Sequence, residues 1–140
     1  GDDTDSHIDT LARLCPNNVI AYQACDDKTD SHYPELQLMA DELQNMTSAD
    51  GSSYRLIPLP WPSAKYDQTG QRLPATYANF LITNKKILVP IYGCDTDQQA
   101  LNALQSVSGP RTVVAVNCRV LIEQHGSLHC VTMQLPQGAL

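Results

Sequence analysis

Three side chains near the two ends of the sequence have the types needed for covalent cysteine chemistry. Cys130 supplies a thiol, while His7 and Asp9 supply an imidazole and a carboxylate from far earlier in the chain. A thiol attacks as its thiolate and needs a cation or base beside it, and folding usually brings such groups together. We therefore predict that Cys130 is a nucleophile, that His7 is an acid–base group, and that Asp9 binds a planar cationic group.

Each of these residues also has a purely structural interpretation. A cysteine with apolar neighbours in a strand is commonly a small buried hydrophobic residue, and an acidic segment early in a chain is commonly a surface loop. His125 and His129 lie near Cys130 as metal ligands would, but on the strand predicted there the cysteine faces away from both imidazoles. For the same reason we do not expect His129 to be the base for Cys130. We predict no metal and no other cofactor.

The expected geometry of the site follows from extended backbone at both ends. Alternate side chains of a strand share one face, so His7 and Asp9 would project together toward one substrate. Cys130 follows two small residues, Gly126 and Ser127, which would let the backbone approach a ligand closely. The sequence therefore predicts a site at which two strand starts meet.

The elements that position these residues follow one order twice: strand, strand, helix, strand. The predicted elements of the first copy are 8–14, 19–24, 34–46 and 54–59. Those of the second copy are 77–82, 87–91, 97–107 and 112–116. Thr96 and Gln99 have the spacing of a capping box at the start of the second helix. A proline-rich run at 58–62 should begin a long loop to Pro74, in which Trp61 would either wall a pocket or anchor the loop.

The two copies predict a mixed α+β fold of ββαβ modules at about 7–60 and 76–120, within one catalytic domain over 1–140. A final strand at 127–135 would open a third module that has no helix after it. This unpaired strand indicates a fragment of a larger domain. The alternative is an unrepeated α+β domain, because the two copies share the order of their elements and no obvious residue identity.

Composition narrows the classes of partner. The formal net charge is −6, and nine Lys and Arg residues are scattered along the chain, which argues against nucleic acid and favours a small cationic substrate. No apolar run approaches the roughly 20 residues that cross a bilayer, and the first residues are not those of a signal peptide. Five cysteines without a Cys-x-x-Cys spacing fit reduced thiols. We expect a cytoplasmic protein that binds neither nucleic acid nor a membrane.

Three segments resemble the agmatine deiminase family, a relative of the bacterial peptidylarginine deiminases in the guanidine-modifying superfamily. These segments are 1–9 (GDDTDSHID), 72–80 (RLPATYANF) and 124–134 (QHGSLHCVTMQ). The resemblance implies the pentein fold, a five-bladed α/β propeller of ββαβ modules. This chain would hold its C-terminal part, about two modules and the opening strand of another. Two departures stand out: Ser6 replaces a common glycine, and Ser127-Leu128 replaces a glycine-rich or amide-bearing stretch.

The resemblance also implies roles for the three residues. Cys130 would attack the guanidinium carbon of agmatine, His7 would protonate the departing ammonia and then activate water, and Asp9 would grip the guanidinium. The product would be N-carbamoylputrescine, a precursor of putrescine. Further guanidinium-binding carboxylates would come from an upstream part of the same protein. A peptidylarginine deiminase and an inactive fragment that needs its upstream half are the alternatives, and the oligomeric state, a homo-oligomer included, stays open.

Overall fold

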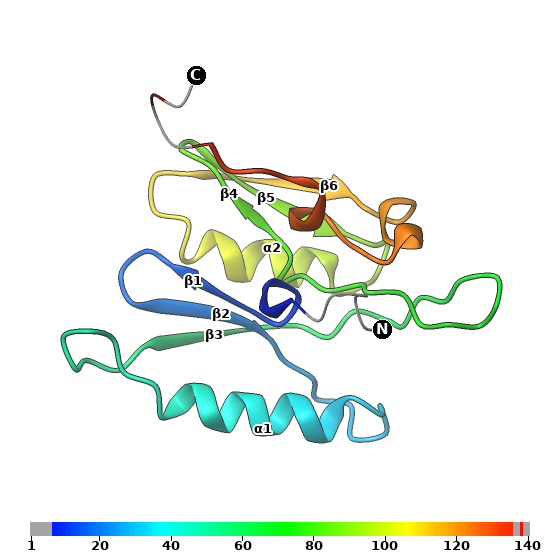
Figure 1. Cartoon of the computed structure of the whole chain (residues 1–140), viewed down its shortest axis with the longest axis horizontal. Helices are drawn as coiled ribbons and strands as arrows, with labels where there is room; N and C mark the ends of the chain where they lie inside the picture. Colours follow the sequence, from blue (N-terminus) through cyan, green and yellow to red (C-terminus); the bar gives the residue numbers. More distant parts are fainter. Residues whose placement is uncertain (1–6, 136–137, 139–140) are drawn as a thin grey trace.

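Two three-stranded sheets, each built around one helical connection, form the body of the molecule (Figure 1). The computed structural model describes residues 7–135 and 138. The strands are β1 Ala12–Cys15, β2 Val19–Gln23, β3 Arg55–Leu59, β4 Leu81–Ile82, β5 Lys86–Ile91 and β6 Thr112–Asn117. The helices are α1 Tyr33–Gln44 and α2 Asp97–Gln105. The strand orders are β1-β2-β3 and β4-β5-β6.

Both sheets repeat the same pairing. The first two strands of each sheet are antiparallel, and the second and third are parallel. A tight turn suffices for the antiparallel pair: between β1 and β2, Asn17 and Asn18 both have positive φ, which asparagine tolerates better than most residues. A parallel pair needs a long crossover, which α1 and α2 supply. The predicted order of strand, strand, helix and strand is thus present twice, while a five-bladed propeller stays a prediction.

The helices pack by their apolar stripes. In α1 the buried residues Leu36, Ala40 and Leu43 recur at helical spacing, and the helix packs on β2 of the first sheet. Helix α2 packs against β5 and β6 and also contacts β3, so it joins the two sheets. The main core accordingly draws buried residues from both halves of the chain. No helix in residues 7–135 is long and apolar enough to span a bilayer.

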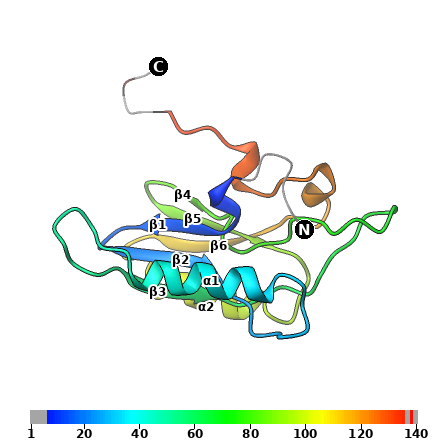
Figure 2. The ribbon, with the colours of Figure 1, turned by 60° about the horizontal axis from the view of Figure 1, so that its bottom comes forward.

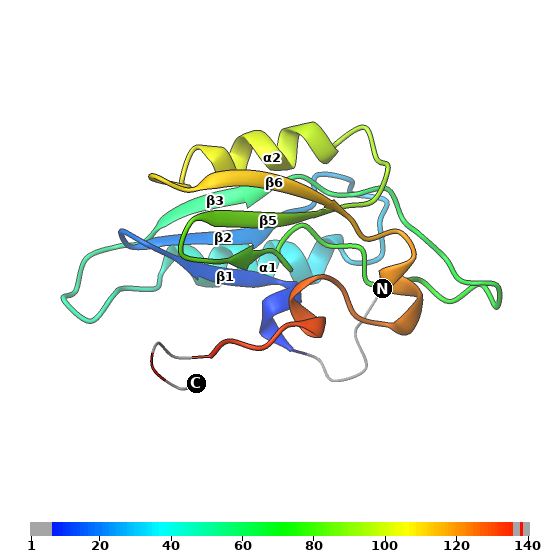
Figure 3. The same ribbon diagram turned by 90° about the horizontal axis from the view of Figure 1, so that it is seen from above.

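Both segments predicted to carry the site fold as turns rather than strands. Ile8–Thr10 and His129–Val131 are short 3-10 helices, and the strand β1 begins only at Ala12. The predicted strand at 127–135 is therefore wrong, as is the start of the strand at 8–14. The two turns lie side by side across the strands from α2 (Figures 2 and 3).

The predicted strand at 77–82 shortens to Leu81–Ile82 because side chains take up its backbone groups. The buried Gln23 Oε1 accepts the Tyr77 N–H at 3.0 Å, and the Thr76 hydroxyl accepts the Ala78 N–H at 3.2 Å. Arg13 donates to the Phe80 carbonyl at 2.8 Å. These three backbone groups are therefore not free to pair with a neighbouring strand.

Two further details concern Pro58, which the predicted strand 54–59 already contained, and the predicted capping box. Pro58 lies inside β3, which is tolerated because β3 is an edge strand of its sheet. Thr96 is the N-cap of α2 but makes no capping bond with its side chain. Its hydroxyl bonds the Tyr77 hydroxyl at 2.9 Å instead, and the predicted capping box does not form.

Candidate functional site

Cys130 lies on the tight turn His129–Val131 and is exposed. The interpretation of Cys130 as a buried hydrophobic residue is therefore wrong. The turn is closed by Thr132, whose N–H and hydroxyl both donate to the His129 carbonyl, at 3.0 and 2.7 Å. A Cβ atom on Gly126 would lie 3.1 Å from the Cys130 Cβ, so the glycine lets the turn fold back on itself. The thiol is thus accessible to a ligand on a closely held backbone.

One buried amide, that of Asn79, joins the two turns. Its Oδ1 accepts the His129 N–H at 2.7 Å and the Cys130 N–H at 3.4 Å, and it lies 3.5 Å from the Cys130 Sγ. Its Nδ2 donates to the Asp9 carbonyl at 3.2 Å. Asn79 is fully buried, so these bonds are shielded from competing water. Asn79 therefore fixes the backbone of Asp9 and Cys130 relative to each other.

The Asp9 carboxylate has one bound oxygen and one unbound oxygen. Its Oδ2 accepts a short hydrogen bond from the Nδ1 of His129. Its Oδ1 is buried and has no hydrogen-bond partner among the described residues. Burying a polar atom unpaired costs about 1–3 kcal/mol. The geometry of Asp9 therefore suits a ligand that brings its own N–H donor.

The position of His129 differs from the prediction. On a strand its imidazole would point away from the site, whereas the 3-10 turn directs it onto Asp9.

His125 has φ 64°, in the left-handed region, and its Nδ1 is buried with no partner among the described residues. Within residues 7–135, no three His, Cys, Asp or Glu side chains are grouped as a metal site would require.

A cation, Arg13, lies beside this cluster. Its guanidinium donates to the Phe80 carbonyl and stacks 5.4 Å above the Phe80 ring. Burial lowers the pKa of Arg13, while the charges of Asp9, Cys15 and Cys130 raise it. Arg13 thus provides a fixed positive charge close to the carboxylate and the thiol.

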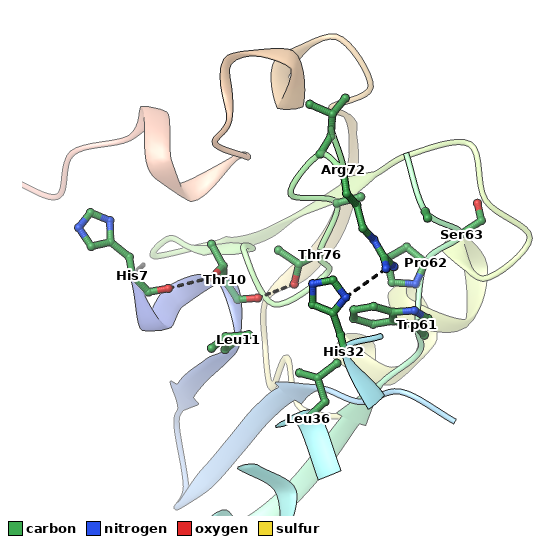
Figure 4. A pocket seen from close by; sticks show the side chains of 13 residues that line it. His7, Thr10, Leu11, His32, Leu36, Trp61, Pro62, Ser63, Arg72 and Thr76 are labelled. Carbon is green, nitrogen blue, oxygen red and sulfur yellow. Dashed lines mark hydrogen bonds between the residues drawn. The ribbon is translucent and has the colours of Figure 1, made fainter. Parts of the chain in front are cut away.

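His7 opens onto a neighbouring cavity (Figure 4). It precedes the first 3-10 turn in an extended conformation, and its carbonyl accepts the Thr10 hydroxyl at 2.8 Å. Figure 4 shows His7 on one side of this cavity, with Trp61 and Arg72 on the other. Asp9 and Cys130 are not among the residues that line it. Asp9 belongs to a 3-10 turn and not to the predicted strand, while His7 before it is extended, so the shared substrate predicted for the two side chains stays a prediction.

The far wall of the cavity is a closed polar network around Asp30. Arg72 binds this carboxylate with two nitrogens, at 2.8 and 2.9 Å, and the Trp61 Nε1 donates to it at 2.9 Å. The bond from Arg72 is the main reason why the pKa of Asp30 lies far below its usual range. Trp61 both lines the cavity and holds its loop, so the two roles considered for it are both present.

Sequence reasoning missed Asn79 and Arg13 as parts of the site. Asn79 lies in the segment 72–80, whose resemblance to a known family was the available signal. Arg13 could have been noticed as a charge inside an apolar run. What it contacts, the Phe80 carbonyl and ring, follows only from the fold.

Comparisons with known proteins agree on one family. Residues 1–136 match the family model described as Porphyromonas-type peptidyl-arginine deiminase. A relative from Marinomonas sp. (strain MWYL1), named "Putative agmatine deiminase", is 32% identical over 97% of this chain and 41% of its own length. The chain therefore spans about two fifths of the curated relatives it matches.

Two solved structures show the same fold. The crystal structure of the "Putative Arginine Deiminase" from Porphyromonas gingivalis is 52% identical with a TM-score of 0.92, and the match covers 98% of this chain and 40% of that one. A substrate-bound agmatine deiminase from C. jejuni, in a Cys-to-Ser variant, is 40% identical with a TM-score of 0.81. That match covers 91% of this chain and 36% of the other.

Proposed function

The chain belongs to the Porphyromonas-type peptidyl-arginine deiminase family, and from this we propose that it is part of a hydrolase that deiminates agmatine. The observation that carries the proposal is that Asn79 holds the exposed Cys130 and Asp9 together, and that the buried Asp9 Oδ1 has no donor among the described residues. A guanidinium ion supplies both an electrophilic carbon for the thiol and N–H donors for the carboxylate. The relatives named as agmatine deiminases favour agmatine over a peptidyl arginine.

The proposed reaction has two steps at Cys130. The thiolate sulfur forms a bond to the guanidinium carbon while Asp9 accepts guanidinium N–H bonds. One C–N bond then breaks, and ammonia leaves with a proton from His7. In the second step His7 takes a proton from water, the water oxygen bonds to the same carbon, and the C–S bond breaks. The products are N-carbamoylputrescine and the free thiol, and no cofactor takes part.

The proposal includes an upstream part of the protein as partner. The relatives are more than twice as long as the matched region, and the proposed guanidinium site needs further carboxylates that we assign to that part. The two sheets would then be ββαβ modules, at about 7–60 and 76–120, of a five-bladed propeller. A cytoplasmic location and a place in putrescine synthesis belong to the same proposal.

The test is release of ammonia and N-carbamoylputrescine from agmatine by this chain together with the upstream part. Cys130→Ser should remove all turnover, because a serine hydroxyl at neutral pH is a far weaker nucleophile than a thiolate. The matched control is Cys25→Ser, a partly exposed thiol bonded to the Asp27 carbonyl, which should keep full activity. Undiminished turnover by Cys130→Ser would reject the proposal. Faster turnover of an arginine-containing peptide than of agmatine would show that the substrate is a peptidyl arginine, while the proposed reaction would stand.

A further inference from the structure

The two turns of the site are joined by one contact between side chains, the hydrogen bond between Asp9 Oδ2 and His129 Nδ1. Both side chains are partly buried, with relative exposures of 18% for Asp9 and 25% for His129. His129 directly precedes Cys130, so the residue that holds the carboxylate is covalently next to the proposed nucleophile. Nothing in the proposed reaction uses the His129 imidazole.

We propose that His129 is a positioning residue that holds Asp9 Oδ2 so that Oδ1 faces the N–H groups of the guanidinium whose carbon Cys130 attacks. This inference rests on the proposed function, because the guanidinium is the ligand assigned there. The buried Oδ1, which has no partner among the described residues, is the atom left to accept the bond from the ligand.

The other contacts of this site leave the rotation of the Asp9 carboxylate undetermined. Asn79 bonds the Asp9 carbonyl and the backbone N–H groups of His129 and Cys130, which fixes the backbone and not the carboxylate plane. The terminal torsion of an aspartate is soft and broad. A hydrogen bond to one of its two oxygens is what determines the direction of the other.

Arg13 does not replace His129 in this role. Its charge interacts with that of Asp9, but its hydrogen bond among the described residues goes to the Phe80 carbonyl. A charge without a directed hydrogen bond attracts the carboxylate and sets no rotation. His129 provides the directed bond, in a position that moves together with the thiol.

The contact itself can be tested in this chain without any activity. In an NMR spectrum of 15N-labelled protein, Asp9→Asn should shift the imidazole resonances of His129 and leave those of His125 in place. His125 is the internal control, since it lies four positions before His129 and makes no bond to Asp9 in the structure. Unshifted His129 resonances would overturn the proposal.

The positioning role requires the substrate. In a Cys130→Ser background with the upstream part present, His129→Ala should weaken agmatine binding about tenfold or more, the loss expected for a charge-assisted hydrogen bond. His129→Asn places an amide N–H where Nδ1 lies and should recover binding to within about threefold. His125→Asn is the matched change at a left-handed position that asparagine tolerates, and it should bind agmatine as the parent does.

Two results would overturn the role: parental affinity in His129→Ala, or no recovery in His129→Asn. Alkylation of Cys130 by iodoacetamide, which needs no carboxylate, should proceed at similar rates in the His129 variants, and a large change would indicate a merely structural effect. If the parent itself binds no agmatine, the proposed function fails, and the NMR comparison alone decides whether His129 holds Asp9.

Discussion

Two carboxylates of this molecule, Asp30 and Asp9, have surroundings that differ in one respect. Asp30 is saturated: Arg72, Trp61 and His32 direct five bonds to its two oxygens, at 2.8–3.1 Å. Asp9 has a partner for one oxygen, while the other is buried with none among the described residues.

This difference is the one expected between a carboxylate that supports the fold and one that binds a ligand, the role proposed for Asp9. A saturated carboxylate stabilises the fold, and its removal leaves buried donors unpaired. A carboxylate with an unbound buried oxygen lowers stability until a donor arrives. Both groups are aspartates outside the strands and α-helices, so residue type alone does not reveal which carboxylate has an unbound oxygen.

The largest expected effect is on agmatine turnover, which a substitution at Asp9 should abolish with little change in stability. A substitution at Asp30 should instead lower the stability. Asp9→Ala should abolish measurable agmatine turnover while changing the free energy of unfolding by less than about 1 kcal/mol, because one oxygen it removes has no partner among the residues that the structure describes. Urea unfolding and product assays on the same preparations measure both quantities. A loss of several kcal/mol in Asp9→Ala would contradict the comparison.

Asp30→Ala should behave in the opposite way. It leaves the guanidinium of Arg72 and the Trp61 N–H without their acceptor, so the free energy of unfolding should fall by about 3 kcal/mol. The Arg72 side chain retains 17% exposure. The loss of stability should therefore lie at the lower end of the range of about 3–5 kcal/mol for breaking a buried ion pair. The fold of the Cys130 turn should survive, as judged by an unchanged rate of iodoacetamide alkylation.

Asn79 links the two turns, and Asn79→Ala should cost about 2 kcal/mol of stability. The change leaves the His129 N–H and the Asp9 carbonyl without their bonds to this side chain in a buried setting. It should also lower turnover, because the carboxylate and the thiol lose their common support. An unaltered melting curve would show that the amide does not hold the turns.

The low pKa of Asp30 predicts a particular pH dependence. Because the folded pKa is lowered, chiefly by Arg72, the stabilisation is fully present above the unfolded value of about 3.9 and is lost as pH falls toward the folded value. The stability difference between the parent and Asp30→Asn should therefore be constant near neutral pH and shrink below about pH 4. Denaturant midpoints across this range measure it, and a difference that grows in acid would contradict the assignment.

The smallest effect is expected at Gly126. A methyl group there would lie 3.1 Å from the Cys130 Cβ, so the turn must open by a few tenths of an ångström. Gly126→Ala should reduce turnover a few-fold and cost about 1 kcal/mol or less. Gly109→Ala is a useful contrast, because a side chain there meets nothing within 4 Å but has an unfavourable φ of 59°.

Much of the fold could be predicted because its signals are local. The apolar spacing of Leu36, Ala40 and Leu43 placed α1, and the asparagine pair at 17–18 marked the first hairpin. The predictions for 77–82 and 127–135 failed because long-range side-chain bonds decide the backbone there. Gln23 binds the Tyr77 N–H, and Asn79 binds the turn of Cys130.

Residue types gave the three candidate site residues, but the sequence predicted only part of how they are arranged. Asp9 and Cys130 do come together, but through Asn79 and His129 rather than as neighbouring strand starts. The catalytic roles of Cys130 and His7 and the substrate-binding role of Asp9 stay predictions.

The most direct test of the central claim is to trap the covalent intermediate. This chain and the upstream part would be mixed with agmatine, quenched in acid within a turnover, digested and analysed by mass spectrometry. We predict an amidino adduct derived from agmatine on Cys130, absent from Cys130→Ser and from the other four cysteines. Ammonia release without any adduct on Cys130, or an adduct on a different cysteine, would contradict the account.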